Sequence, residues 1–137
     1  MTITLDDAQA VADGAIEAAE KQGIKIAVAV SDAGGRLVLL ERMDGAAWAA
    51  DIGAEGKALM SSGFNLSSGR LAGDRGEGHY RLFGGQGDSE HMLYLHGGVA
   101  VFRNNVAIGA CGVSGGTGAQ DEACARTGVA KLDPKRA

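Results

Sequence analysis

Glycine is unusually abundant in this sequence, and this limits how the chain can fold. The chain has 23 glycines in 137 residues, but one proline and six aromatic side chains (one Trp, two Tyr and three Phe). Because glycine has no Cβ, this composition predicts many close approaches between backbones and few bulky side chains to anchor a core. Such chains often complete their core by association. We therefore expect a homo-oligomer, in which the small residues Ala49, Gly53 and Gly56 permit close contact.

Length and composition fit one globular domain over residues 1–137. Apolar residues make up 45% of the chain and charged residues 22%, which are ordinary values for a globular protein. The net charge is −4 and the longest basic run is Lys135-Arg136, so nucleic acid is not an expected partner. No apolar stretch approaches the roughly 18 residues of a membrane span. The acidic start at residues 5–7 is unlike a signal peptide, so we expect a cytoplasmic protein with no membrane partner.

Within the first 43 residues, the spacing of apolar residues changes from the period of a helix to that of a strand. Apolar residues follow a helical spacing up to Gly23, and Thr4 and Asp7 have the positions of a helix cap and of the third helical residue. From Ile24 the apolar residues alternate with small alanines, so both faces of this strand look covered. A glycine turn then leads into a second strand over residues 36–43. This order predicts an antiparallel hairpin.

The rest of the chain predicts a second helix, a long loop, a second hairpin and a last helix. The loop holds ten glycines and is long enough to be a binding loop. Asn104 and Asn105 tolerate the left-handed conformation of a type I′ turn, and Thr117 and Gln120 have capping-box spacing. An antiparallel sheet with helices packed on it follows. The expected ranges are 44–62 for the helix, 63–98 for the loop, 99–103 and 106–114 for the strands, and 117 to about 132 for the last helix.

Four blocks of sequence together resemble one family. They are residues 28–38 (VAVSDAGGRLV), 41–46 (ERMDGA), 109–115 (GACGVSG) and 120–122 (QDE). In this order they resemble the GlcG/HbpS-like family, also labelled as a haem-degrading domain, and the resemblance extends from about residue 4 to residue 132. It implies an α+β, two-layer, profilin-like fold in which a five-stranded antiparallel sheet is flanked by helices. It also implies dimers or larger rings, and some members belong to catabolic operons.

The resemblance implies haem binding or haem degradation, but the chain departs from the family in its histidines. Members implicated in haem binding have a histidine ligand in the N-terminal helical part, whereas the first histidine here is His79. Haem is thus a possible cofactor whose usual axial ligand cannot be carried over. The middle segment, residues 73–96, also differs from the proline-containing stretch that is common in the family, and it holds all three histidines.

The histidines His79, His91 and His96 can serve as acid, base or metal ligand, since histidine titrates near neutral pH. The plainer interpretation is that they are loop or sheet-surface residues. On a continuous strand His91 and His96 would point to opposite sides, so only a broken strand would let both line one pocket. We take His79, His91 and Glu122 as candidate catalytic residues and His96 as a candidate ligand-binding residue. Glu122 can instead be a cap or an interface partner.

The other candidate ligand-binding residues are Arg42, Asp44, Lys57, Ser114 and Gly115. Arg42 ends the second strand and can bind a carboxylate, or it can form a salt bridge with Asp44 or Asp32. Lys57 can bind an anion or, when desolvated, become nucleophilic, although such a lysine is more often simply exposed. Ser114 and Gly115 enter the last helix, where backbone N–H groups can hold a carboxylate or phosphate, or where glycine permits close helix–sheet packing.

Two functions agree with these residues. The first is a binding protein for haem, a corrinoid or another planar or anionic metabolite. The alternative is a cofactor-independent enzyme acting on a small carboxylate or carbonyl intermediate of a bacterial catabolic pathway, in which Arg42 orients the carboxylate and a histidine or an acid moves a proton. A structural or regulatory subunit with a vestigial pocket is a third possibility. We expect the ligand cleft between Arg42 and Asp44 on one side and the loop with His79 and His91 on the other.

Overall fold

The computed structural model describes residues 1–71 and 92–135. Helices and strands follow the order expected from the sequence, and residues 68–71 are also helical. The main elements are α1 (Leu5–Gln22), β1 (Ala27–Asp32), β2 (Leu37–Arg42), α2 (Ala50–Phe64), β3 (Gly98–Arg103), β4 (Val106–Ser114) and α4 (Gly118–Val129).

The strands form one antiparallel sheet in the order β2-β1-β4-β3. The antiparallel sheet flanked by helices is confirmed, but the expectation of five strands is wrong, because the sheet has four among the described residues. Residues 92–96, which lead into β3, form no strand. The backbone N–H of Leu93 donates instead to the carbonyl of Gly56 in α2, at 3.1 Å. This segment is therefore tied to a helix and does not extend the sheet.

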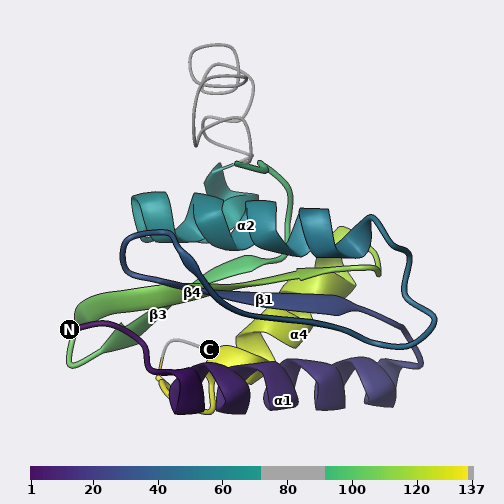
Figure 1. The fold of residues 1–137 in the computed structure, drawn as a ribbon, viewed down its shortest axis with the longest axis horizontal. Helices are drawn as coiled ribbons and strands as arrows, with labels where there is room; N and C mark the ends of the chain where they lie inside the picture. Colours follow the sequence, from purple (N-terminus) through teal and green to yellow (C-terminus); the bar gives the residue numbers. More distant parts are fainter. Residues whose placement is uncertain (72–91, 136–137) are drawn as a thin grey trace.

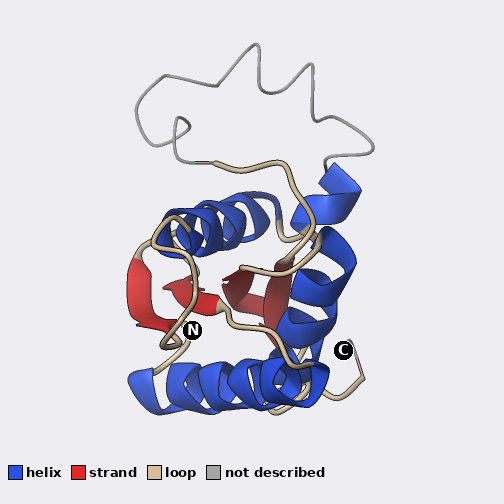
Figure 2. Cartoon of the chain, turned by 90° about the vertical axis from the view of Figure 1, so that its right-hand side faces the viewer, coloured by secondary structure: helices blue, strands red, loops and turns tan. Residues whose placement is uncertain are grey.

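Helices cover both faces of the sheet, so the expected two layers are in fact three (Figures 1 and 2). Helices α1 and α4 lie on one face and α2 on the other. Val28 and Val30 of β1 belong to the apolar cluster with α1 and α4, whereas Ala27 and Ala29 pack with the alanines of α2. A strand that is apolar or small on both faces needs cover on both faces, which is the physical reason for the third layer.

The predicted helix caps are confirmed. The side chain of Thr4 accepts the N–H of Asp7 at 3.1 Å, and the Asp7 carboxylate accepts the N–H of Thr4 at 3.2 Å. Thr117 and Gln120 form the same reciprocal pair at the start of α4. Each cap satisfies backbone N–H groups that have no partner inside the helix.

The second hairpin is also confirmed, whereas the second helix begins later than expected. Asn104 and Asn105 have φ values of 52° and 64°, the left-handed pair that a type I′ turn requires. Helix α2 begins at Ala50 and not at residue 44. Gly45 has a φ of 88°, which is incompatible with a right-handed helix at that position.

The glycines of α2 serve packing within the chain. Gly53 and Gly56 are buried, and a Cβ on Gly53 would lie 2.4 Å from the Oγ of Ser114 in β4. Gly53 thus packs against the sheet and Gly56 is buried within the chain, so neither is exposed for the association that we expected at these two positions. Association itself stays a prediction. The large apolar side chains that lie exposed near the start of α2 are Trp48 and Ile52, at 72% and 63%.

An ion pair joins the start of α1 to the β3–β4 hairpin. The guanidinium of Arg103 donates to both oxygens of Asp7, at 3.1 and 3.2 Å. The hydrogen bonds from Arg103 lower the pKa of the Asp7 carboxyl below its ordinary value of 3.8. A carboxyl group whose pKa is lowered by folding stabilises the folded state fully above the unfolded-state pKa, and this contribution is lost as the pH falls through the folded-state value.

Arg103→Gln should therefore destabilise the protein at neutral pH and matter less in acid. The expected result is a lower urea midpoint for the variant at pH 7, and a smaller difference from the wild type at pH 3, where Asp7 becomes protonated in the unfolded chain. Urea unfolding followed by circular dichroism at the two pH values measures this. An equal difference at both pH values would contradict the assigned role of Asp7.

Candidate functional site

A buried ion pair lies at one end of the sheet, between α2 and the first turn of α4. The Nζ of Lys57 donates to the carbonyl of Val113 at 2.9 Å and to Oδ2 of Asp121 at 3.0 Å. Both charged side chains are almost fully buried, at 4% and 3% exposure. A buried charge is tolerated when it is paired and hydrogen-bonded, and these contacts meet that condition. Lys57 is thus not the exposed lysine that we considered, and its ligand-binding role stays a prediction.

Asp121 also fixes the turn that enters α4. Its Oδ1 accepts the N–H of Gly116 at 2.8 Å, while the side chain of Gln120 accepts the N–H of Thr117 at 2.9 Å. Two of the backbone donors near the predicted anion site are therefore already used inside the protein. Ligand binding at Ser114 and Gly115 stays a prediction. A ligand there would not have the N–H groups of Gly116 and Thr117 as donors.

His96 and Glu122 lie side by side on the outside of the ion pair. The Nδ1 of His96 is 3.5 Å from Oε1 of Glu122, and the histidine side chain is 58% exposed. The other carboxylate oxygen of Glu122 is 3.5 Å from Nε of Arg126, one helical turn further along α4. The structure thus brings together two residues that we singled out, His96 and Glu122, and adds Arg126, which we did not.

The backbone around His96 is held on both sides. The Gly97 carbonyl accepts the N–H of Val113 at 2.9 Å, and the N–H of Gly98 donates to Oγ of Ser68 at 2.7 Å. The hydroxyl of Ser68 in turn donates to the carbonyl of Leu95. His96 therefore projects from a fixed turn before β3, and the continuous strand that we considered for this histidine is absent from residues 92–96.

The remaining predicted site residues are not joined to this cluster by any described contact. Arg42 and Ser114 both pair with Ala27, so they lie at the same end of the sheet with β1 between them. Two strand spacings separate them by roughly 10 Å. Asp44 follows Arg42, and both are exposed. The predicted catalytic residues at positions 79 and 91 lie outside the described residues, so the expected cleft stays a prediction.

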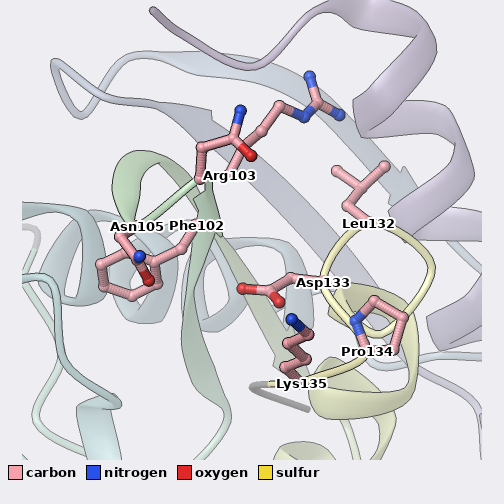
Figure 3. A pocket seen from close by; sticks show the side chains of 8 residues that line it. Phe102, Arg103, Asn105, Leu132, Asp133, Pro134 and Lys135 are labelled. Atoms are coloured by element: carbon pink, nitrogen blue, oxygen red, sulfur yellow. The ribbon is translucent and has the colours of Figure 1, made fainter.

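A large hollow of about 550 Å³ lies between the β3–β4 turn and the chain after α4 (Figure 3). Arg103 lines it, but its guanidinium turns toward α1 and its partner Asp7. Asp133 and Lys135 bring charges of opposite sign to the same hollow. This mixture gives no single-sign site for an anion or a cation.

A second hollow runs along β3 on the side away from β4, and we call it the β3-edge groove. Its volume is about 300 Å³. Arg70 and Arg126 are its charged residues, and Phe102 is its aromatic one. Because Arg126 contacts Glu122, the groove adjoins the His96–Glu122 pair. The complete lining is Asn65, Leu66, Ser67, Arg70, Val99, Ala100, Phe102 and Arg126.

Sequence reasoning missed Arg126 and the pairing of Asp121 with Lys57. Arg126 follows Glu122 by four residues on a predicted helix, so helical spacing alone would have placed the two side chains together. The Lys57–Asp121 pair spans 64 positions and has no local signal.

Two further features of the described residues concern metal clusters and thiols. The described residues contain no group of three His, Cys, Asp or Glu side chains that could hold a metal ion. Cys111 is buried, and burial raises the pKa of its thiol to about 12, so it is protonated at neutral pH. Among the helices of the described segments, none has the length and apolar character needed to cross a membrane.

In the described part of the chain, a four-stranded antiparallel sheet lies between helices and has a histidine–carboxylate pair at one end, which defines a small α+β protein. The family model described as "Haem degrading protein HbpS-like" matches residues 3–130. The chain therefore belongs to the HbpS-like family, which confirms the resemblance seen in the sequence.

Solved structures agree with this family. A double mutant of HbpS from Streptomyces reticuli is 32% identical with a TM-score of 0.86, over 96% of this chain and 88% of that chain. The Klebsiella pneumoniae protein ORFY is 28% identical with a TM-score of 0.87, over 96% and 91% of the two chains. PduOC, solved as a complex with haem, is 24% identical with a TM-score of 0.85, over 97% and 96%, and shows the same fold. No curated protein sequence matches the chain.

Proposed function

We propose that this protein binds haem or another planar, anionic metabolite, with His96 as the ligand to a bound metal. The family description supports a haem-related role. PduOC is a haem complex of the same fold, but its 24% identity establishes the fold alone. The proposal therefore draws on the family and on the surroundings of His96.

The observation that carries the proposal is the contact between His96 and Glu122. Histidines that bind metals usually donate one ring N–H to a carboxylate, which orients the ring and leaves the other nitrogen for the metal. Here Nδ1 faces the Glu122 carboxylate at 3.5 Å and the side chain is 58% exposed. Nε2 is then the nitrogen available to a ligand. His96 would hold haem through this nitrogen, and the bound group would supply an iron for it to ligate.

Haemin titration of the full chain tests this proposal. The wild type should give a sharp Soret band that saturates with haemin, and His96→Ala should lose it. Glu122→Gln should weaken binding by about tenfold or more, the usual cost of removing a carboxylate that orients a metal-bound histidine. Glu20→Gln, an exposed glutamate on α1, is the matched control and should bind like the wild type.

A wild-type spectrum and affinity in His96→Ala would contradict the assignment of His96. Loss of the Soret band in His79→Ala or His91→Ala, with His96→Ala unchanged, would move the metal ligand to one of the predicted histidines outside the described residues.

The same contact favours a second candidate, the cofactor-independent enzyme. A histidine oriented by a carboxylate is also the usual form of a general base, and Arg126 places a guanidinium beside that carboxylate. This function requires binding of a small carboxylate without haemin. Proton exchange of a small 2-oxo acid in D₂O, followed by NMR and lost in His96→Ala, would favour it over haem binding.

A further inference from the structure

Two glycines lie against the side chain of His96. A Cβ on Gly69, in the helical turn of residues 68–71, would lie 2.2 Å from Nδ1 of His96, 2.6 Å from Cε1 and 2.7 Å from Cγ. A Cβ on Gly118, at the start of α4, would lie 3.1 Å from Cβ of His96, 3.7 Å from Cγ and 3.8 Å from Cδ2. The imidazole thus has its Nδ1 side toward Gly69 and its Cδ2 side toward Gly118.

The approach at Gly69 is the closer of the two. Cβ atoms in proteins essentially never lie within 3.0 Å of a non-bonded heavy atom, and all three distances at Gly69 are below this limit. No residue with a side chain therefore fits at position 69 while the ring stays in its place. At Gly118 the 3.1 Å approach is tight, but a small adjustment relieves it. The position of the ring depends mainly on Gly69.

The ring atom nearest to Gly69 is also the one that faces Glu122. Nδ1 of His96 lies 3.5 Å from Oε1 of Glu122. Gly118 and Glu122 are four residues apart and so share one face of α4, along which the histidine lies. A Cβ at position 69 would displace Nδ1 and break its contact with the carboxylate.

The ring can yield to such a Cβ more easily than the backbone can. The side chain of His96 is 58% exposed, so it can rotate toward solvent. The backbone beside it is held, because the buried Ser68 accepts the N–H of Gly98 at 2.7 Å. Alanine is also favoured over glycine inside a helix. A methyl group at position 69 should therefore change the orientation of His96 without destabilising the fold.

We propose that Gly69 is a positioning residue for His96. Its missing Cβ leaves the space in which the imidazole turns Nδ1 to Glu122 and presents Nε2 to a ligand. Gly69 acts through the histidine and not on the ligand. The inference rests on the proposed function only for the ligand at Nε2, since the orientation of the ring belongs to the ligand-free protein.

Nitrogen-15 NMR of the ligand-free full chain tests this orientation directly. At a pH where the imidazole is neutral, a ring that donates from Nδ1 to a carboxylate carries its proton on Nδ1, whereas a solvated ring carries it mostly on Nε2. The wild type should show His96 protonated mainly on Nδ1, and Gly69→Ala should show it mainly on Nε2. The signals of His96 are those that disappear in His96→Ala.

Haemin titration measures the effect on binding. Gly69→Ala should weaken haemin binding by about tenfold or more, as Glu122→Gln does, because both changes remove the orientation of the same ring. The two effects should not add. Glu122→Gln in the Gly69→Ala background should change the affinity little further, since the contact that it removes is already broken.

Gly63→Ala is the matched control, because Gly63 is an exposed helical glycine whose Cβ would meet Met92 and not His96. It should keep the wild-type NMR signals and affinity, and both alanine variants should melt no lower than the wild type. The same His96 tautomer in Gly69→Ala and the wild type, or a melting temperature of Gly69→Ala well below that of Gly63→Ala, would overturn the inference. Haemin binding that does not depend on His96, with the tautomer change still seen in Gly69→Ala, would overturn the proposed function and support this inference.

Discussion

Lys57→Met is expected to destabilise the folded protein by about 3–5 kcal/mol, the usual cost of removing one partner of a buried ion pair. The side chains of Lys57 and Asp121 are 4% and 3% exposed, and their charged atoms lie 3.0 Å apart. Methionine has a similar length but no charge, so the Asp121 carboxylate would stay buried without a cation. The Val113 carbonyl would lose its bond to Nζ as well. Urea unfolding at pH 7 measures the change in the free energy of unfolding.

Two further variants show whether the buried charge is the cause. Adding Asp121→Asn to Lys57→Met should recover part of the loss, because it removes the unpaired charge while the amide oxygen can still accept the N–H of Gly116. Lys21→Met breaks an exposed pair with Glu17, 77% and 57% exposed, and should cost about 0–1 kcal/mol. If Lys57→Met costs no more than Lys21→Met, the buried pair does not stabilise the fold as we argue.

The features that sequence predicted best are those with a local signal. The capping boxes at Thr4 and Thr117 and the turn at Asn104 and Asn105 each depend on residues within a few positions of one another. The interactions that form such a motif all lie within one helical turn or one hairpin. Periodicity likewise placed most helices and strands close to their observed ranges.

The layer count and strand count failed for a different reason. They came from the resemblance, and they depend on contacts between distant segments. The alternation of valine and alanine in β1 already indicated cover on both faces, and the alanines of α2 provide that cover on the second face. The hydrogen bond from Leu93 to Gly56, by contrast, joins residues 37 positions apart, and no local sequence pattern predicts it.

The sequence singled out several residues of the candidate site, but it did not predict how the fold arranges them. His96, Glu122 and Lys57 were all singled out, yet the sequence placed His96 in the same group as Arg42, which lies on the far edge strand β2. What assembles the site is the fold itself. Lys57 holds the start of α4 against β4, and this brings Glu122 next to His96.

The closest approach in this packing lies between α2 and β4, at Gly112. A Cβ at this position would lie 2.1 Å from the carbonyl oxygen of Ala54 and 2.6 Å from the backbone nitrogen of Ala58. Both atoms belong to the backbone of α2, so no side-chain rotation relieves the overlap, and the helix must move away from the sheet. Glycine, which is abundant in this sequence, lets the backbone of α2 pack almost directly on β4 at this position.

Gly112→Ala should therefore lower the free energy of unfolding by about 1–3 kcal/mol, the usual cost of overpacking. Because α2 also carries Lys57, the shift of the helix should weaken haemin binding at His96 together with stability. Urea unfolding and haemin titration of the same preparation measure both effects.

Gly63→Ala is the control on the same helix. Gly63 is exposed, and its Cβ would meet the flexible end of Met92 at 3.0 Å. Alanine is favoured over glycine by up to about 1 kcal/mol inside a helix, so this variant should be neutral or more stable. Equal stability of Gly112→Ala and the wild type would show that α2 is not held against β4 as closely as the structure places it.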